Sequence, residues 1–412
     1  MLVDALKKKN LSNNIRLLIK CIFIFGFIYD INFSFLPSLT TGRLCFLALI
    51  IYSIFKKKGI PRVAMSFILI LCFILVIVLM QYSYSSDSTQ ISRIIWFTLY
   101  GILSPFLFIN FIKSKNEFLY LISIAVVIQA GLSIFSFINP SIKSLFYNLI
   151  IYTSNFDEDQ SLRAVGFASI GGAALSVIQS IGVITILFLF RTNVFGFYKS
   201  LLLWGGIIVI ILSIVLIGRT GLFISFFCIL LYFISEIRNV KNVIVFGLII
   251  FALYQINWLT ILERATTDVS GFNITIFTEW VENAFKIKNN DTTEVLTNMP
   301  IPSLSVETLL GTGMVVDPSG VGNASGHDSG YIQTYYSLGL LMATFFYFSY
   351  LSFLIKQIPP KGKYLYLLIF VMFIIEIKEP FIFQYIYPFF VLSMIRLMRK
   401  FDVKHLKSKI KY

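Results

Sequence analysis

Long runs of apolar residues recur along the chain and constrain its fold more than any other feature of the sequence. The run from Val63 to Tyr82 is one example. A helix needs roughly 20 apolar residues to cross about 30 Å of hydrocarbon. The runs are too long and too unbroken for the strands of a membrane barrel, which have roughly 10 residues and alternate in polarity. The sequence therefore predicts an all-α protein that crosses a membrane many times.

The composition agrees with this class, and the apolar runs divide the chain into three parts. The chain is 57% hydrophobic and only 13% charged, whereas soluble domains carry about 25% charged residues. We expect an N-terminal transmembrane bundle of about nine helices over 1–258, a large outer loop over 259–329, and C-terminal helices with a basic tail over 330–412. The expected spans, about twelve in all, are 17–36, 41–55, 63–82, 93–112, 118–138, 167–190, 200–217, 220–235, 242–258, 330–355, 364–378 and 380–396.

Basic residues lie between the apolar runs and predict the orientation of the chain. The net charge is +14, which in a soluble protein could indicate nucleic-acid binding, but here the positions of the charges indicate membrane topology. With the N-terminus in the cytoplasm, 25 of the 34 Lys and Arg residues lie inside and 9 outside. Because cytoplasmic loops carry the excess of basic residues, we expect both termini in the cytoplasm and no nucleic-acid partner. Lys7–Lys9 precede a full-length span, so the first helix is expected to be retained rather than cleaved.

The polar stretch 311–340, GTGMVVDPSGVGNASGHDSGYIQTYYSLGL, is the first place to look for chemistry. It contains His327, which is one of two histidines in the chain, followed by Asp328. A neutral imidazole can take a proton from a sugar hydroxyl at physiological pH. Asp328 could orient the ring, or it could cap the helix that we expect to begin near Gly330. A solvated loop histidine without a catalytic role is the alternative.

Several arginines lie on the predicted outer side, against the charge bias of the rest of the chain. Guanidinium groups bind phosphate oxygens with two parallel hydrogen bonds and remain charged, so convergent arginines would form a site for a pyrophosphate. Arg219 is the clearest candidate, because its Gly-Arg-Thr-Gly turn between two spans has no evident structural need for arginine. The alternative is that such side chains extend from helix ends to the lipid headgroups. The candidates are Arg93, Arg163, Arg219 and Arg264.

A charged cluster of Glu376, Lys378 and Glu379 precedes Pro380 at an outer turn. These side chains could pair with each other, or they could contact a sugar or the arginines. Small residues near the sixth expected span suggest close helix packing, namely Ser169, Gly171, Gly172 and Ser176.

The sequence predicts neither a metal nor a cofactor. The cysteines lie inside apolar runs without the spacing of a zinc or redox site; they are Cys21, Cys45, Cys72 and Cys228. The acidic run Asp157–Asp159 is interpreted as a solvated loop rather than a metal-binding motif.

Three segments resemble the superfamily of O-antigen ligases and polymerases, and most closely the Wzy-type O-antigen polymerases. They are RAVGFASIGGAAL at 163–175, IGRTGLFISFF at 217–227, and GTGM…GHDSGYIQTYYSLGL at 311–340. The order of the features is also similar: two arginine-bearing segments, and then a long outer loop that ends in a His-Asp segment.

The resemblance implies a metal-independent, inverting glycosyltransferase of the bacterial inner membrane. It would join oligosaccharide repeat units, with undecaprenyl pyrophosphate carrying both the donor and the acceptor glycan, and a chain-length regulator protein could be a partner. The family's pyrophosphate-binding arginines match Arg163 and Arg219, and its catalytic histidine matches His327. Arg93 and Arg264 match no family pattern and rest on their positions alone.

Two other functions fit the same sequence. One is an O-antigen ligase, which transfers finished glycan to the lipid A core. The other is a polysaccharide flippase or ion-coupled transporter, which would favour charged residues within the membrane and inverted repeats.

Overall fold

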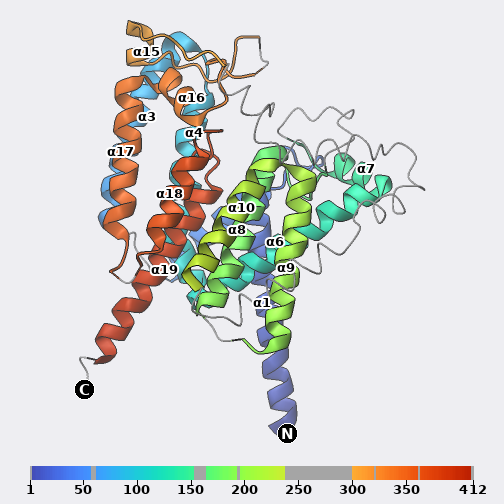
Figure 1. Ribbon diagram of the computed structural model, residues 1–412. Coiled ribbons are helices and arrows are strands. Elements are labelled where there is room, and N and C mark those ends of the chain that lie inside the picture. The colour runs from blue at the N-terminus through green and yellow to red at the C-terminus, as the bar shows by residue number, and fades with distance from the viewer. Residues whose placement is uncertain are drawn as a thin grey trace. The chain divides into compact units, whose positions relative to one another are not determined.

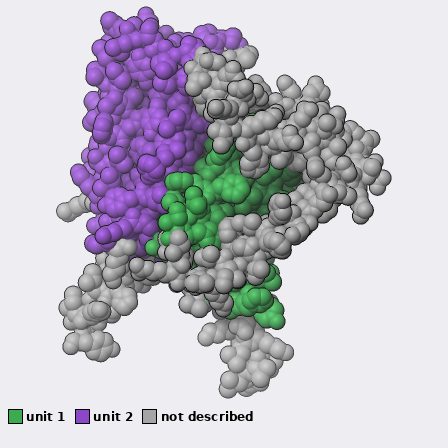
Figure 2. Space-filling model, in the orientation of Figure 1, with its two compact units in different colours: residues 1–45, 116–286 green, residues 46–115, 287–412 purple. Residues whose placement is uncertain are grey.

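The computed structural model of the chain is helical throughout the residues that it describes, which are 2–56, 62–152, 164–192, 195–236, 299–319, 322–360 and 362–409 (Figure 1). Within these residues extended pairing is limited to two isolated bridges, Phe33 with Ile150 and Val316 with Asn323. The chain forms two compact units (Figure 2). Unit 1 comprises residues 1–45 and 116–286, and unit 2 comprises residues 46–115 and 287–412.

Six helices of the described residues are long and apolar enough to cross a membrane, which confirms the predicted class of an all-helical, membrane-type chain. They are Ala64–Ser85, Thr89–Phe111, Lys115–Ile138, Gly172–Arg191, Phe197–Ile217 and Leu340–Gln357. Three further apolar helices are shorter: Thr41–Phe55, Arg219–Ile234 and Leu365–Ile375. The span expected at 242–258 and the loop residues 259–298 lie outside the described residues.

Unit 1 is built around helices that pack through small residues. Its helices are α1 (Leu2–Tyr29), α6 (Lys115–Ile138), α7 (Pro140–Leu149), α8 (Gly172–Thr192), α9 (Phe197–Ile217) and α10 (Arg219–Glu236). A Cβ atom on Gly221 of α10 would lie 2.0 Å from the backbone oxygen of Ser176 on α8. The Ser176 hydroxyl accepts a hydrogen bond from the Gly221 N–H group at 3.1 Å. Small-residue packing is therefore confirmed at Ser176.

Unit 2 contains the chain segments on which the candidate site depends. Helix α2 (Thr41–Phe55) runs into it from unit 1, and its other helices are α3 (Arg62–Ser85), α4 (Thr89–Trp96), the π-helix η1 (Phe97–Leu103), α5 (Ser104–Phe111), α15 (Val306–Leu310), α16 (Gly330–Leu338), α17 (Leu340–Gln357), α18 (Leu365–Ile375) and α19 (Ile386–Lys409). Figure 1 shows α3 and α17 side by side, which agrees with the contacts between them.

The structure divides helices that the sequence predicts as continuous. The span expected at 330–355 is broken at Gly339, whose φ of 87° is unfavourable for other residues. The span expected at 93–112 begins at Thr89 and passes through η1 just before Pro105. Proline lacks an N–H group and disturbs the preceding turn, which accounts for the changed hydrogen-bond register.

The last two expected spans, 364–378 and 380–396, also have different ends. Helix α18 stops at Ile375 and α19 begins only at Ile386. The residues between them form turns around Pro380, and Tyr385 has a φ of 48°. A proline cannot continue the backbone ladder of a helix, so a hydrophobic count alone overestimates the helical length here.

Candidate functional site

The two ends of the stretch 311–340 meet in unit 2. Gly311 and Gly339 have φ angles of 96° and 87°, and a Cβ atom on either residue would lie within 2.6 Å of the other's backbone nitrogen. The N–H groups of Thr312 and Gly313 donate to the carbonyl oxygens of Tyr336 and Ser337 at 3.0 and 2.9 Å. The loop that carries His327 is therefore closed at its base by backbone contact that only glycine permits.

Side chains from α3, and from the turn that follows it, hold this closed loop. The Gln81 amide donates to the carbonyl oxygens of Leu310 and Leu338 at 2.8 and 3.2 Å. The Asp87 carboxylate accepts from the N–H groups of Val315 and Val316 at 2.6 and 3.0 Å. Partial burial raises the pKa of Asp87, but hydrogen bonds from Thr89, Val316 and Val315 together lower it by more, so the pKa lies below its ordinary value.

His327 is buried, with 7% of its surface exposed, and its ring is held by the backbone. Its Nδ1 atom accepts a hydrogen bond from the N–H group of Ser329 at 3.0 Å. An N–H group can only donate, so Nδ1 carries the lone pair and the proton of a neutral imidazole is on Nε2. In this geometry His327 offers a hydrogen-bond donor, and it does not offer the proton acceptor that the sequence suggests.

Asp328 follows His327 in the sequence, and its side chain is exposed. Its carboxylate accepts from the Asn323 amide at 3.5 Å and neither orients the His327 ring nor caps a helix. The N-cap residue of α16 is Ser329, which makes no side-chain capping bond. The prediction that a helix begins at Gly330 is confirmed, whereas the capping alternative for Asp328 is wrong.

Arg93 of α4 is joined to the His-Asp segment through one intervening side chain. Its Nη2 atom donates to Gln333 Oε1 at 3.1 Å, and Gln333 Nε2 donates to the carbonyl oxygen of Asp328 at 3.0 Å. The Nη1 atom of Arg93 is buried and has no hydrogen-bond partner among the described residues. An unsatisfied guanidinium donor is costly, so the site has the capacity to bind an anion or another acceptor.

Glu376 is the residue of this site whose importance the sequence underrates. It is fully buried, and its carboxylate accepts from Tyr347 Oη at 2.8 Å and from the Ile382 N–H group at 2.7 Å. Burial raises the pKa of Glu376 to about 7, although these hydrogen bonds and the charge of Arg93 act in the opposite direction. Glu376 therefore bonds to Tyr347 and Ile382 instead of pairing within the cluster of Lys378 and Glu379. The sequence signal for a buried acidic residue here is that a carboxylate directly follows the apolar run of α18.

The start of α16 leaves room for this carboxylate. A Cβ atom on Gly330 would lie 2.5 Å from Glu376 Oε1 and 2.6 Å from the Cα atom of Pro380. The Gly330 N–H group also donates to the Glu376 carbonyl oxygen at 2.9 Å. Gly330 thus couples the position of Glu376 to the residues just before α16, which include Asp328.

A groove of about 440 Å³ lies on unit 2 beside these residues. Its lining includes the aliphatic residues Ile301 and Leu304 and the aromatic residues Tyr331, Tyr335 and Tyr347. Tyr347 reaches from this groove to Glu376, so the groove and the polar site share a wall. Apolar and aromatic walls of this kind suit a lipid chain or the face of a sugar ring.

The other arginine candidates are not brought to this site by the described residues. Arg219 is the first residue of α10 in unit 1, directly after Gly218. The N–H group of Ala164 donates to the carbonyl oxygen of Leu216 at 3.0 Å, so the segment that begins at Ala164 lies beside the end of α9. Arg163 and Arg264 lie outside the described residues.

The site and the fold together define an all-helical, membrane-type protein with a buried polar cluster beside a polar loop. Among the described residues, no group of three His, Cys, Asp or Glu side chains could hold a metal ion. No model of a known protein family, no curated protein and no solved structure matches the chain.

Proposed function

We propose that the chain is a membrane glycosyltransferase that joins oligosaccharide repeat units carried on undecaprenyl pyrophosphate, as an O-antigen polymerase does. The observation that supports it best is the link from Arg93 through Gln333 to Asp328, next to His327. The link reaches the backbone carbonyl of Asp328, and it supports a shared role for the Arg93 cation, the His327 imidazole and the exposed Asp328 carboxylate in unit 2. Transfer of a glycan from a diphosphate needs a cation for the leaving group and a proton acceptor for the attacking hydroxyl.

Arg93 would stabilise the leaving diphosphate. Negative charge grows on the phosphate oxygen as the bond to the sugar breaks, and a guanidinium in a water-poor site stabilises that charge strongly. The unpartnered Nη1 atom supplies the free donor. The family resemblance assigns pyrophosphate binding to Arg163 and Arg219, and Arg264 is a further candidate by its position in the sequence.

Asp328 and His327 would divide the work on the acceptor. The exposed Asp328 carboxylate takes the proton from the acceptor hydroxyl, and this oxygen attacks the anomeric carbon from the face opposite the diphosphate. The Nε2–H group of His327 donates a hydrogen bond to a substrate oxygen, because its Nδ1 atom is occupied by Ser329. The sugar–phosphate bond breaks, the new glycosidic bond forms with inversion, and the diphosphate leaves with its lipid.

The test is complementation of a strain that lacks the gene, with the chain-length ladder on lipopolysaccharide gels as the readout. Arg93→Ala and Asp328→Asn are each expected to leave a single repeat unit on the core while membrane insertion is retained. Asp317→Asn is the matched control, since Asp317 lies in the same loop and, among the described residues, its carboxylate accepts hydrogen bonds from Ser319. A normal ladder from both Arg93→Ala and Asp328→Asn would exclude this site from polymerisation.

A transporter is the second candidate, and the buried Glu376 favours it. A buried carboxylate near an arginine inside a helical bundle is typical of ion-coupled transport. The same strain separates the alternatives. Loss of a polymerase leaves one repeat unit on the core, whereas loss of a ligase or of a flippase leaves none.

A further inference from the structure

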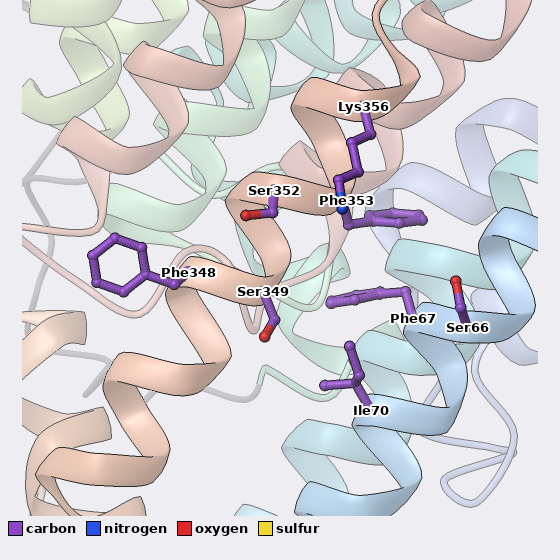
Figure 3. A pocket seen from close by; sticks show the side chains of 8 residues that line it. All are labelled: Ser66, Phe67, Ile70, Phe348, Ser349, Ser352, Phe353 and Lys356. Carbon is purple, nitrogen blue, oxygen red and sulfur yellow. The ribbon is translucent and has the colours of Figure 1, made fainter.

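A second groove lies between α3 and α17 in unit 2. It is close to the start of α3 and the end of α17, whereas the loop that carries His327 and Asp328 (the His-Asp loop) lies at the opposite ends of these helices. The groove has a volume of about 310 Å³. Its lining comes from the first turns of α3 and the last turns of α17 (Figure 3): Ser66, Phe67, Ile70, Phe348, Ser349, Ser352, Phe353 and Lys356. None of these residues belongs to the candidate site.

The floor of the groove is made of stacked aromatic rings. The rings of Phe67 and Phe353 have centroids 4.4 Å apart and an interplanar angle of 13°. Phe67 also stacks against the ring of Tyr350, with the two ring centroids 5.7 Å apart. Phe67 is buried, so the floor is a rigid part of the helix packing and its shape does not depend on a ligand.

The rim of the groove is polar and carries one cation. Figure 3 shows the Lys356 side chain folded back toward Phe353, with Ser352 and Ser349 on the same helix and Ser66 on α3. Lys356 is exposed and forms no ion pair with a carboxylate in the described part of the chain. The neighbouring connections at this end add further positive charge, because Lys56 directly follows α2 and Lys363 lies in the link from α17 to α18.

We propose that this groove binds an anionic phospholipid. The phosphate lies against the Lys356 ammonium and the serine hydroxyls, and an acyl chain covers Ile70 and the Phe67–Phe353 floor. Charge complementarity selects the occupant, since a zwitterionic lipid would bring its own cation next to Lys356 and a free phosphate would leave the aromatic floor uncovered. This proposal does not depend on the glycosyltransferase proposal.

Native mass spectrometry of the purified full chain tests the assignment. The protein is released from mixed micelles that contain equal amounts of dioleoylphosphatidylglycerol and dioleoylphosphatidylcholine. We expect the wild type to retain at least one phosphatidylglycerol in preference to phosphatidylcholine. Lys356→Gln should lower that preference by about fivefold, the effect of one lysine near a lipid phosphate. Lys363→Gln is the matched control, because Lys363 is exposed at the same end and does not line the groove.

A second variant tests the apolar half of the site. Ser349→Phe fills the groove without removing charge, and it should reduce the retention of phosphatidylglycerol as strongly as Lys356→Gln does. Equal effects of Lys356→Gln and Lys363→Gln would show general attraction to the surface and would overturn the proposal. So would protection against thermal unfolding by inorganic phosphate alone, or retention of both lipids to the same extent by the wild type. Lipid retention that Ser349→Phe leaves unchanged would place the lipid elsewhere.

Discussion

At the scale of single residues, the tautomer of the His327 ring decides which role this side chain can take in the proposed reaction. Both nitrogen atoms of an imidazole can serve in catalysis, but a backbone N–H group can only donate. The bond from Ser329 to Nδ1 therefore leaves Nε2–H as the group that His327 could offer to a substrate in the proposed reaction. A sequence shows the residue type and not its tautomer, which is why it suggests a base where the structure offers a donor.

Substitution of His327 distinguishes these roles. We expect His327→Gln to retain part of the chain-length ladder, since a glutamine amide can donate a hydrogen bond from nearly the position of Nε2. His327→Ala should lose the ladder. The measurement is the distribution of chain lengths at matched membrane levels of the two variants. Equal and complete loss in both would indicate that the imidazole itself takes the proton.

Asp87 connects residue chemistry to the stability of the loop. The pKa of Asp87 in the folded protein is below its ordinary value. Its carboxylate therefore stabilises the folded state at pH values above the pKa of the unfolded chain, and this stabilisation is lost as the pH falls through the folded-state pKa. We expect Asp87→Asn to lower the free energy of unfolding by about 1 kcal/mol at pH 7. The difference from the wild type should be smaller at pH 3 than at pH 7, because pH 3 lies below the ordinary pKa of an aspartate. Thermal unfolding in detergent at both pH values measures it, and a constant difference would contradict the hydrogen-bond explanation.

At the scale of helices and loops, the contact between Gly311 and Gly339 closes the base of the loop. These positions lie 28 residues apart in the sequence, yet each occupies the space that the other's side chain would need. The backbones also require positive φ angles. Two independent penalties therefore apply to any substitution there.

Gly339→Ala separates these penalties when it is compared with Gly322→Ala. Gly322 has a φ of 84° but nothing within 4 Å of an added Cβ atom. Gly322→Ala should therefore cost only the backbone strain, about 1 kcal/mol. Gly339→Ala should cost clearly more, because the added atom meets the Leu310 backbone at 2.4 Å. Thermal unfolding of both variants tests this, and equal shifts would show that the glycine contact adds nothing.

The same elements show how far the sequence predicts the structure. Hydrophobic length predicts the helical class, and several ends agree closely: α2 spans Thr41–Phe55, as expected for 41–55. The break at Gly339 escapes prediction because it depends on contact with Gly311, which is distant in sequence. A turn before Pro380 is predicted, but its full extent over 376–385 is not, because Glu376 also bonds to the distant Tyr347. Arg93 was predicted from its position alone. Its link to Asp328 needed Gln333, which nothing in the sequence marks.

At the scale of the whole molecule, α3 and α17 separate the proposed sugar-transfer site from the proposed lipid groove. Helix α17 has 18 residues, or about 27 Å of rise, which is close to the thickness of the hydrocarbon layer. The His-Asp loop precedes one end, and Lys356 lies at the other. The two sites should then face opposite sides of the membrane, and the positive-inside rule assigns the Lys356 end to the cytoplasm.

Single cysteines report this arrangement directly. In a background where the four native cysteines are replaced, Ser319→Cys in the exposed His-Asp loop should react with a membrane-impermeant maleimide in intact spheroplasts. Lys363→Cys, at the far end of α17, should react only after the membrane is opened. Complementation of the ladder by both variants establishes that each protein is folded. If both cysteines react from the same side, α17 does not cross the membrane. The sugar-transfer site and the lipid groove could then not face opposite sides of the membrane.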